Sequence, residues 1–399
     1  MKILQVANKI PYPTKDGGAI ACMNLAKGFS LLGHDVTFLA MNTRKHNVTL
    51  DEIPNSVKEL ATFKLVDVPA TINAFSALLN FVFSRQPYNA VRFITDRFAR
   101  ALEEEITTNK YDVIQLEGLY VCPYIPLIRK KTDALIVYRS HNIEYEIWDR
   151  AAEMSSGLRR FYLKNLSARI KRFERRLLNT YDVVVPITER DGEILTEMGN
   201  SCPLHVSQTG IDTSALFPSA KNLDYPSLFH IGSLEWAPNQ EGLVWFIENC
   251  WPQLHKRYPN LKCYIAGRNA PPWLVKKFEV PNFVFLGEVA DAYEFMNSKA
   301  IMLVPLFSGS GMRIKIIEGM ALGKSIVSTP IGAEGIEVEG NKNILIAENG
   351  EKYINAVCRL IDDEQLFQEI GKNAIGFIHK KFDNLTAASE LVEFYKSNL

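Results

Sequence analysis

The sequence predicts an α/β fold made of two Rossmann-like domains, each built around a parallel sheet. Short apolar runs alternate with longer amphipathic stretches along the whole chain of 399 residues, which is typical of repeated β-α-β units. The series of runs stops near residue 204 and restarts near residue 227. At about 150 residues per domain, the length also favours two domains.

The first domain is expected to span residues 1–204. Its later strands are apolar enough to be buried on both faces of a parallel sheet. A helix predicted at Ala19–Leu32 follows the first strand and ends at Gly33, as helices commonly do. The predicted strands are Lys2–Ala7, Asp35–Ala40, Lys64–Val68, Val113–Leu116, Leu135–Ser140 and Asp182–Pro186.

A linker is expected at residues 205–226, because Gly210, Pro218 and Pro226 interrupt any periodicity there. The second domain should then span residues 227–382. Residues 383–399 follow it, and apolar residues recur at helical spacing along Leu385–Leu399. The predicted strands are Leu228–Ile231, Lys262–Ala266, Val284–Leu286, Ile301–Val304, Ser325–Ser328 and Asn343–Ala347.

Composition excludes several classes of protein. Lys+Arg and Asp+Glu both number 45, so no global charge indicates nucleic-acid binding. No stretch approaches the roughly 20 apolar residues of a membrane span, and the first residues read as a strand rather than a signal peptide. The six cysteines form no C-x-x-C pair and have no His at zinc-ligand spacing, which favours reduced thiols in a cytoplasm. Each cysteine is interpreted as a small buried residue.

Two loops of the first domain are candidates for ligand binding, because ligands bind beyond the carboxyl ends of parallel strands. Gly17-Gly18 precede a helix, where backbone N–H groups can approach an anion, although glycines are also ordinary turn residues. His141, Asn142 and Glu144 follow the fifth strand, and His can hold a proton near neutral pH. A helix-capping segment is an equally good interpretation. Glu117, after the fourth strand, is a weaker candidate.

Two loops of the second domain are also candidates. Gly232-Ser233 follows its first strand, and nearby Trp236 is more simply a packing residue. On a helix beginning near Gly311, that glycine, Lys315 and Glu318 would share one stripe. Backbone donors, a cation and a carboxylate in one line suit a phosphate and a sugar diol. A surface Lys–Glu pair would be the simpler interpretation without the glycines.

Together these loops resemble the retaining GT-B glycosyltransferases of family 4, over nearly the whole chain. The family's glycine loop, cleft His and interdomain Asn-Gly-Ile-Asp match Gly17-Gly18, His141 and Thr209-Gly210-Ile211-Asp212. Its two glutamates, which contact the donor hexose and the ribose, fall on Ser310 and Glu318. Its pyrophosphate-binding cations should follow Gly232, where this chain has Ser233. We therefore expect Arg313 and Lys315 to replace those cations.

The resemblance implies sheets that face a central cleft, a final helix that crosses back to the first domain, and transfer of a sugar with retention. His141, Lys315 and Glu318 would be catalytic. The acceptor site would include Glu117, Asn142 and Glu144. The donor site would include Gly17, Gly18, Gly232, Ser233, Arg268, Val289, Ser310, Gly311, Met312, Arg313 and Glu334.

The implied partners are a nucleotide sugar as donor and a saccharide or lipid-linked saccharide as acceptor, with no cofactor, no metal and no nucleic acid. A role in cell-surface polysaccharide or glycolipid synthesis is expected. The alternatives are a nucleotide-sugar epimerase or hydrolase of the same architecture, and a non-catalytic nucleotide-sugar-binding protein.

Residues 158–178 are rich in Arg and Lys and contain a single acid, Glu174. Such a helix could contact anionic lipid, which would place a cytoplasmic protein at the inner face of a membrane, although a solvated helix fits as well. The apolar stretch Ile72–Phe83 fits either an acceptor entrance or a core.

Overall fold

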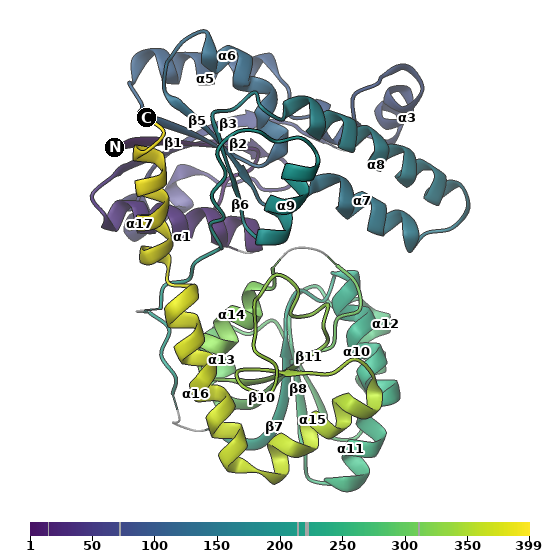
Figure 1. Ribbon diagram of the computed structural model, residues 1–399. Coiled ribbons are helices and arrows are strands. Elements are labelled where there is room, and N and C mark those ends of the chain that lie inside the picture. The colour runs from purple at the N-terminus through teal and green to yellow at the C-terminus, as the bar shows by residue number, and fades with distance from the viewer. Residues whose placement is uncertain (15, 72, 214, 220–222, 310–311) are drawn as a thin grey trace. The chain divides into compact units, whose positions relative to one another are not determined.

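The computed structural model describes residues 1–14, 16–71, 73–213, 215–219, 223–309 and 312–399. The chain forms two compact units (Figure 1). Unit 1 comprises Met1–Gly210 and Asn384–Leu399, and unit 2 comprises Ile211–Asp383. Each unit contains a six-stranded parallel sheet with helices packed on it, so the predicted α/β class is confirmed.

The sheet of unit 1 has the strand order β3-β2-β1-β4-β5-β6. Chain order reverses between β1 and β4, which places a crevice at their carboxyl ends. Every predicted strand of this domain is present, with β2 three residues longer than expected. The strands are β1 (Lys2–Ala7), β2 (Asp35–Thr43), β3 (Thr62–Val68), β4 (Val113–Glu117), β5 (Leu135–Ser140) and β6 (Val183–Pro186).

The helices of unit 1 cover this sheet, because their apolar stripes pack on its largely buried strands. They are α1 (Gly17–Leu31), α2 (Asn55–Lys58), α3 (Ala74–Phe83), α4 (Tyr88–Val91), α5 (Asp96–Thr108), α6 (Ile125–Arg129), α7 (Glu144–Glu153), α8 (Gly157–Leu177), α9 (Glu189–Glu197) and α17 (Asn384–Lys396), with 3-10 turns η1 (Leu50–Glu52) and η2 (Leu119–Tyr124).

The last helix, α17, belongs to unit 1 although it follows unit 2 in sequence, as expected for a helix that crosses back. It packs on α1 (Figure 1). The two helices approach closely at Gly28. A Cβ at Gly28 would lie only 2.6 Å from the Cβ of Ala388. The hydroxyl of Tyr395 also donates to the Gln115 side chain in β4, at 2.6 Å. The C-terminal helix is therefore part of the core of unit 1.

The sheet of unit 2 has the order β12-β11-β10-β7-β8-β9. Its strands are β7 (Asp224–Ile231), β8 (Lys262–Ala266), β9 (Phe283–Gly287), β10 (Lys299–Val304), β11 (Ser325–Ser328) and β12 (Leu345–Ile346). Its helices are α10 (Ala237–Asn249), α11 (Trp251–Arg257), α12 (Pro272–Lys277), α13 (Ala292–Ser298), α14 (Ile314–Ala321), α15 (Gly350–Asp362) and α16 (Glu364–Lys381).

The predicted linker extended too far, because β7 already begins at Asp224. Pro226 had suggested a turn. The ladder between β7 and β8 starts at the next residue, Ser227, so the proline nitrogen is not needed as a donor in that ladder. The boundary between the units lies at Gly210 and Ile211.

None of the described helices combines the length and apolar character that a bilayer span requires. All six cysteines are free thiols, and five of them are buried.

Candidate functional site

A pocket of about 740 Å³ lies in unit 1 beyond the carboxyl ends of β1, β4 and β5. Five residues predicted from the sequence line it together: Gly18, Glu117, His141, Asn142 and Glu144. They come from α1 and from the ends of two neighbouring strands, which the parallel topology brings to one edge. Gly17 is the first residue of α1 and precedes the lining Gly18.

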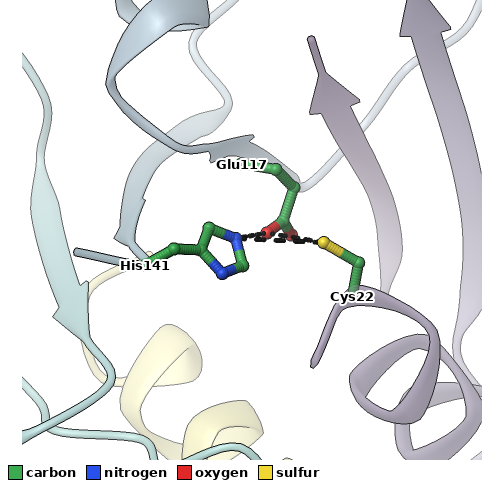
Figure 2. Close-up of side chains that lie close together, drawn as sticks. All are labelled: Cys22, Glu117 and His141. Atoms are coloured by element: carbon green, nitrogen blue, oxygen red, sulfur yellow. Dashed lines mark hydrogen bonds and ion pairs between the residues drawn. The ribbon is translucent and has the colours of Figure 1, made fainter. Parts of the chain in front are cut away.

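Glu117 and His141 form an ion pair in the wall of this pocket, with Oε2 and Nε2 2.7 Å apart (Figure 2). Burial opposes ionisation of Glu117, but the hydrogen bond and charge of His141 outweigh it and hold the pKa of Glu117 below its ordinary value. An ionised Glu117 accepts a hydrogen from Nε2, which leaves Nδ1 as the other ring nitrogen. That nitrogen, Nδ1, has no hydrogen-bond partner among the described residues.

The second carboxylate oxygen of Glu117, Oε1, accepts hydrogen bonds from two buried amides, Gln5 at 3.1 Å and Gln115. The thiol of Cys22 donates to Oε2 at 3.3 Å. Reading the sequence missed these three residues as parts of the site. A single Gln inside the apolar strands KILQVA and VIQLE was the available signal, because a buried amide needs a partner.

Glu144 also lines the pocket and accepts a hydrogen bond from the Tyr120 hydroxyl at 2.8 Å. Burial raises the pKa of Glu144. Its backbone N–H donates to Glu174, whose pKa burial and the Glu144 charge raise to about 8. The start of α1 already holds a carboxylate, because the Asp16 side chain accepts from the Ala19 N–H at 3.0 Å. The anion-binding donors expected beside Gly17-Gly18 are thus partly used by the chain itself.

In unit 2, Lys315 reaches the loop after β7. Its Nζ donates to the Asn239 Oδ1 at 3.0 Å and lies 3.1 Å from where a Cβ on Gly232 would stand. The amide of Asn239 in turn donates to the backbone carbonyl of Ser233 at 2.8 Å. Burial, and then the charge of Arg313, lower the pKa of Lys315 to about 7. Two segments that are far apart in the sequence therefore lie together. We call the group formed by Gly232, Asn239 and Lys315 the cradle.

Helix α14 begins at Ile314, so the helix start predicted near Gly311 is wrong. Ser310 and Gly311 lie outside the described residues. Arg313 precedes the helix with φ −88° and ψ 87°, and its guanidinium lies over the Trp236 ring, 5.4 Å from the centroid. Because its backbone is not helical, the Arg313 side chain does not point in the direction that an ideal helix would give it. Trp236 serves as a platform for this cation.

Glu318 lies one turn after Lys315 on α14 and accepts a hydrogen bond from the Tyr293 hydroxyl at 2.8 Å. Burial raises the pKa of Glu318 to about 7, although the hydroxyl partly offsets this. Reading the sequence did not identify Tyr293 as a partner, because it lies on a different helix, α13.

The other predicted donor residues lie in loops at the same edge of the sheet. Arg268 follows β8, and its carbonyl accepts from the Leu234 N–H at 2.9 Å, which ties this loop to the Gly232 loop. Val289 follows β9, and Glu334 follows β11. Met312 is partly buried just before α14. The roles assigned to these residues stay predictions.

We expect Glu318→Gln to weaken nucleotide-sugar binding by about 1.5–3 kcal/mol, roughly 10- to 160-fold, because the amide removes a charged acceptor for the ribose hydroxyls. Since the pKa of Glu318 is about 7, the difference from the unmodified protein should shrink below that pH. Isothermal titration at pH 6 and pH 8 measures both effects. The control is Tyr293→Phe, which removes the hydroxyl but keeps the Glu318 carboxylate. If Glu318→Gln and the unmodified protein bind the nucleotide sugar equally well at pH 8, Glu318 is not part of the site.

Comparison with known proteins finds matches along both units of the chain. Residues 15–215 match the family described as Glycosyltransferase Family 4, and residues 225–363 match Glycosyl transferases group 1. An "Uncharacterized 44.6 kDa protein in cps region" of Klebsiella pneumoniae is 21% identical over 98% of both chains. The "Uncharacterized glycosyltransferase MJ1069" of Methanocaldococcus jannaschii is 26% identical over 28% of this chain and 30% of its own.

Solved structures share the fold over the full length. Anabaena Alr3699/HepE in complex with UDP has a TM-score of 0.69 at 16% identity, covering 100% of both chains. Sucrose-phosphate synthase (tll1590) of Thermosynechococcus elongatus has a TM-score of 0.74 at 14% identity, covering 100% of this chain and 99% of its own. A mutant S. aureus TarM in complex with Fondaparinux, alpha-GlcNAc-glycerol and UDP has a TM-score of 0.72 at 11% identity, covering 99% of both.

Proposed function

Because the chain belongs to Glycosyltransferase Family 4 and is a glycosyltransferase of the GT-B fold, we propose that it moves a sugar from a nucleotide-diphosphate sugar to an acceptor hydroxyl with retention. The observation that carries the proposal is the cradle in unit 2, where Lys315 lies beside the side-chain-free Gly232. Burial lowers the pKa of Lys315 to about 7, which means that its charged form is poorly stabilised in the free protein. A bound anion would stabilise that charged form.

In the proposed reaction, the bond between the anomeric carbon and the diphosphate oxygen breaks, and the acceptor oxygen bonds to that carbon on the same face. The acceptor proton leaves with the diphosphate. Lys315 and Arg313 would neutralise the charge that develops on the leaving group, and Glu318 would hold the ribose. We propose that no metal or other cofactor is required, because these two cations supply the positive potential.

The pocket of unit 1 is proposed to take the acceptor, a saccharide or a lipid-linked saccharide. Its wall offers Glu117, His141, Asn142 and Glu144, which suit sugar hydroxyls. Glu117 would hold the His141 ring in place at the pocket wall. Structures of HepE and TarM are complexes with UDP and with glucose or other saccharides, and this supports a role in polysaccharide or glycolipid synthesis.

A thermal-shift panel of nucleoside-diphosphate sugars tests the proposed function. A donor at 100 times its Kd should add about 2.7 kcal/mol to the free energy of unfolding. We expect one nucleotide base to raise the midpoint clearly and its sugar-free diphosphate to raise it too, since the proposed contacts are to phosphate and ribose. A panel in which no nucleotide shifts the midpoint would contradict the assignment.

A surface on unit 1 supports peripheral contact with a membrane. Helix α8 holds the end of α3, since the Arg169 guanidinium donates to the carbonyls of Asn80 and Phe81 at 3.1 and 2.6 Å (Figure 1). Large apolar side chains are exposed on these two helices, with Phe83 on α3 at 83% and Leu158 on α8 at 89%. Basic residues adjoin them on α8, namely Arg159, Arg160 and Lys164. We propose that this surface docks on anionic lipid at the cytoplasmic face.

Co-sedimentation with vesicles tests this docking. The protein should bind vesicles that contain phosphatidylglycerol more than vesicles of phosphatidylcholine alone, and less at high salt. The double variant Phe83→Ser/Leu158→Ser should lose most of this binding. The matched control is Phe217→Ser in unit 2, which removes an apolar side chain that is 67% exposed. Equal losses in both variants, or no preference for anionic vesicles, would contradict a lipid-docking surface.

The two alternatives drawn from the sequence are less favoured. An epimerase or hydrolase would need no acceptor site, whereas unit 1 offers a polar pocket lined by an ion pair. A non-catalytic binding protein would not need that pair.

A further inference from the structure

Three side chains of different chemistry converge in the pocket wall of unit 1: the thiol of Cys22, the carboxylate of Glu117 and the imidazole of His141 (Figure 2). Cys22 Sγ lies 3.3 Å from Glu117 Oε2 and 3.8 Å from His141 Nε2, and those two atoms lie 2.7 Å apart. One potential ligand atom from each residue therefore points at the same small volume.

Thiolate, imidazole and carboxylate together are the ligand set of zinc. Around a tetrahedral zinc, with bonds of about 2.0–2.3 Å, such ligand atoms stand about 3.3–3.6 Å from one another. The two distances from Cys22 Sγ are close to this spacing. Only the Glu117–His141 separation must widen, and it would do so when an ion replaces the hydrogen between them. Binding would release the Cys22 thiol proton, and thiolate and carboxylate would then balance the two charges of the ion.

The surroundings hold these ligands in place. Gln5 and Gln115 fix Glu117 through Oε1 and leave Oε2 for the cluster, and the Tyr395 hydroxyl fixes Gln115. Hydrogen bonds of this kind orient the ligands of metal sites. All three ligand residues line the pocket of about 740 Å³, so an ion has an entry path and an open fourth position.

We propose that Cys22, Glu117 and His141 form a zinc site that switches off the acceptor pocket. Zinc would bind Glu117 Oε2 and His141 Nε2, so neither atom could then contact an acceptor hydroxyl. The ion would also occupy the pocket wall. Metal binding stands on the geometry alone, whereas the inhibitory effect rests on the proposed function.

Cobalt(II) absorption tests the site without reference to activity. In a Cys202→Ser background, which removes the one cysteine that is not fully buried, one Co²⁺ per chain should give a thiolate-to-cobalt band, and one equivalent of Zn²⁺ should abolish it. Cys22→Ser should lose the band. Cys122→Ser is the matched control and should keep it, because Cys122 is also buried but its thiol donates to the Gly118 carbonyl, at 3.6 Å, and is not part of the cluster.

A cobalt titration without a thiolate band, or with the same band in Cys22→Ser, would overturn the site. Circular dichroism establishes that each variant is folded. The regulatory part is tested by the ratio of turnover with and without zinc, which should fall at least tenfold in the Cys202→Ser protein and stay near one in Cys22→Ser. Zinc binding with an unchanged ratio would overturn the inhibition. A protein that binds zinc but transfers no sugar under any condition would contradict the proposed function and leave the metal site standing.

Discussion

Replacing Lys315 with alanine should lower the rate of sugar transfer by about 100- to 1,000-fold at saturating donor, a loss of about 2.7–4 kcal/mol of transition-state stabilisation. Lys315 is the cation that lies directly against the Gly232 loop. A leaving diphosphate gains charge as its bond to the sugar breaks, so the ammonium acts most strongly at that moment. The effect should therefore appear in kcat more than in KM, as measured by initial rates with the acceptor present.

The matched variants separate charge from packing. Lys315→Met keeps most of the side-chain volume and should be nearly as slow as Lys315→Ala. Arg313→Ala should cost less, because Arg313 precedes the helix and lies over the Trp236 ring. Lys352→Ala, which removes an exposed lysine on α15, should have no effect. Near-normal turnover in Lys315→Ala would mean that other groups hold the phosphate.

The pH dependence provides an independent check on Lys315. Its pKa is lowered to about 7 in the free protein, so it loses its charge as pH rises through 7, and diphosphate affinity should fall between pH 7 and 9. His230, at the end of β7, stays neutral over this range, because burial and the Lys315 charge hold its pKa well below the ordinary value. Glu318 titrates in the same range, so the measurement belongs in the Glu318→Gln variant. Lys315→Ala in that background should flatten the profile.

The fold could be predicted from the sequence because each buried strand is a short apolar run with a distinct beginning. The run LIVYRS, for example, is fully buried and coincides with β5. Boundaries were less accurate where a single residue suggested a break. Pro226 suggests a turn in the sequence but lies within β7. It is tolerated there because the pairing of β7 with β8 begins one residue later, at Ser227. Local composition cannot reveal such a detail, since it depends on which neighbour a strand pairs with.

The candidate site could be predicted only in part. His141 and Glu117 stood out because each follows a strand, and parallel pairing of β4 with β5 brings their ends together. Cys22 gave no comparable signal, because it lies inside an apolar helix, where a cysteine is usually a small packing residue. Its contact with Glu117 joins residues that are 95 positions apart. Only the packing of α1 on the sheet creates that contact.

His141→Ala is expected to lower turnover by about 100-fold, because the acceptor loses a group that positions it, while leaving the affinity for free nucleoside diphosphate within about twofold. The reason is the division of the chain. His141 belongs to unit 1, whereas Lys315, Glu318 and the Gly232 loop belong to unit 2. Single-turnover rates measure the first effect, and titration calorimetry measures the second.

A matched variant tests how His141 acts. Glu117→Gln keeps the shape of the side chain and the contacts to Gln5 and Gln115 in part, but it removes the charge that fixes the His141 tautomer. If Glu117 holds His141 in its working position, Glu117→Gln should lose a large share of the turnover that His141→Ala loses, and the double variant should be little slower than His141→Ala alone. Multiplicative losses in the double variant would mean that the two residues act independently. A collapse of diphosphate affinity in His141→Ala would contradict the assignment of the nucleotide to unit 2.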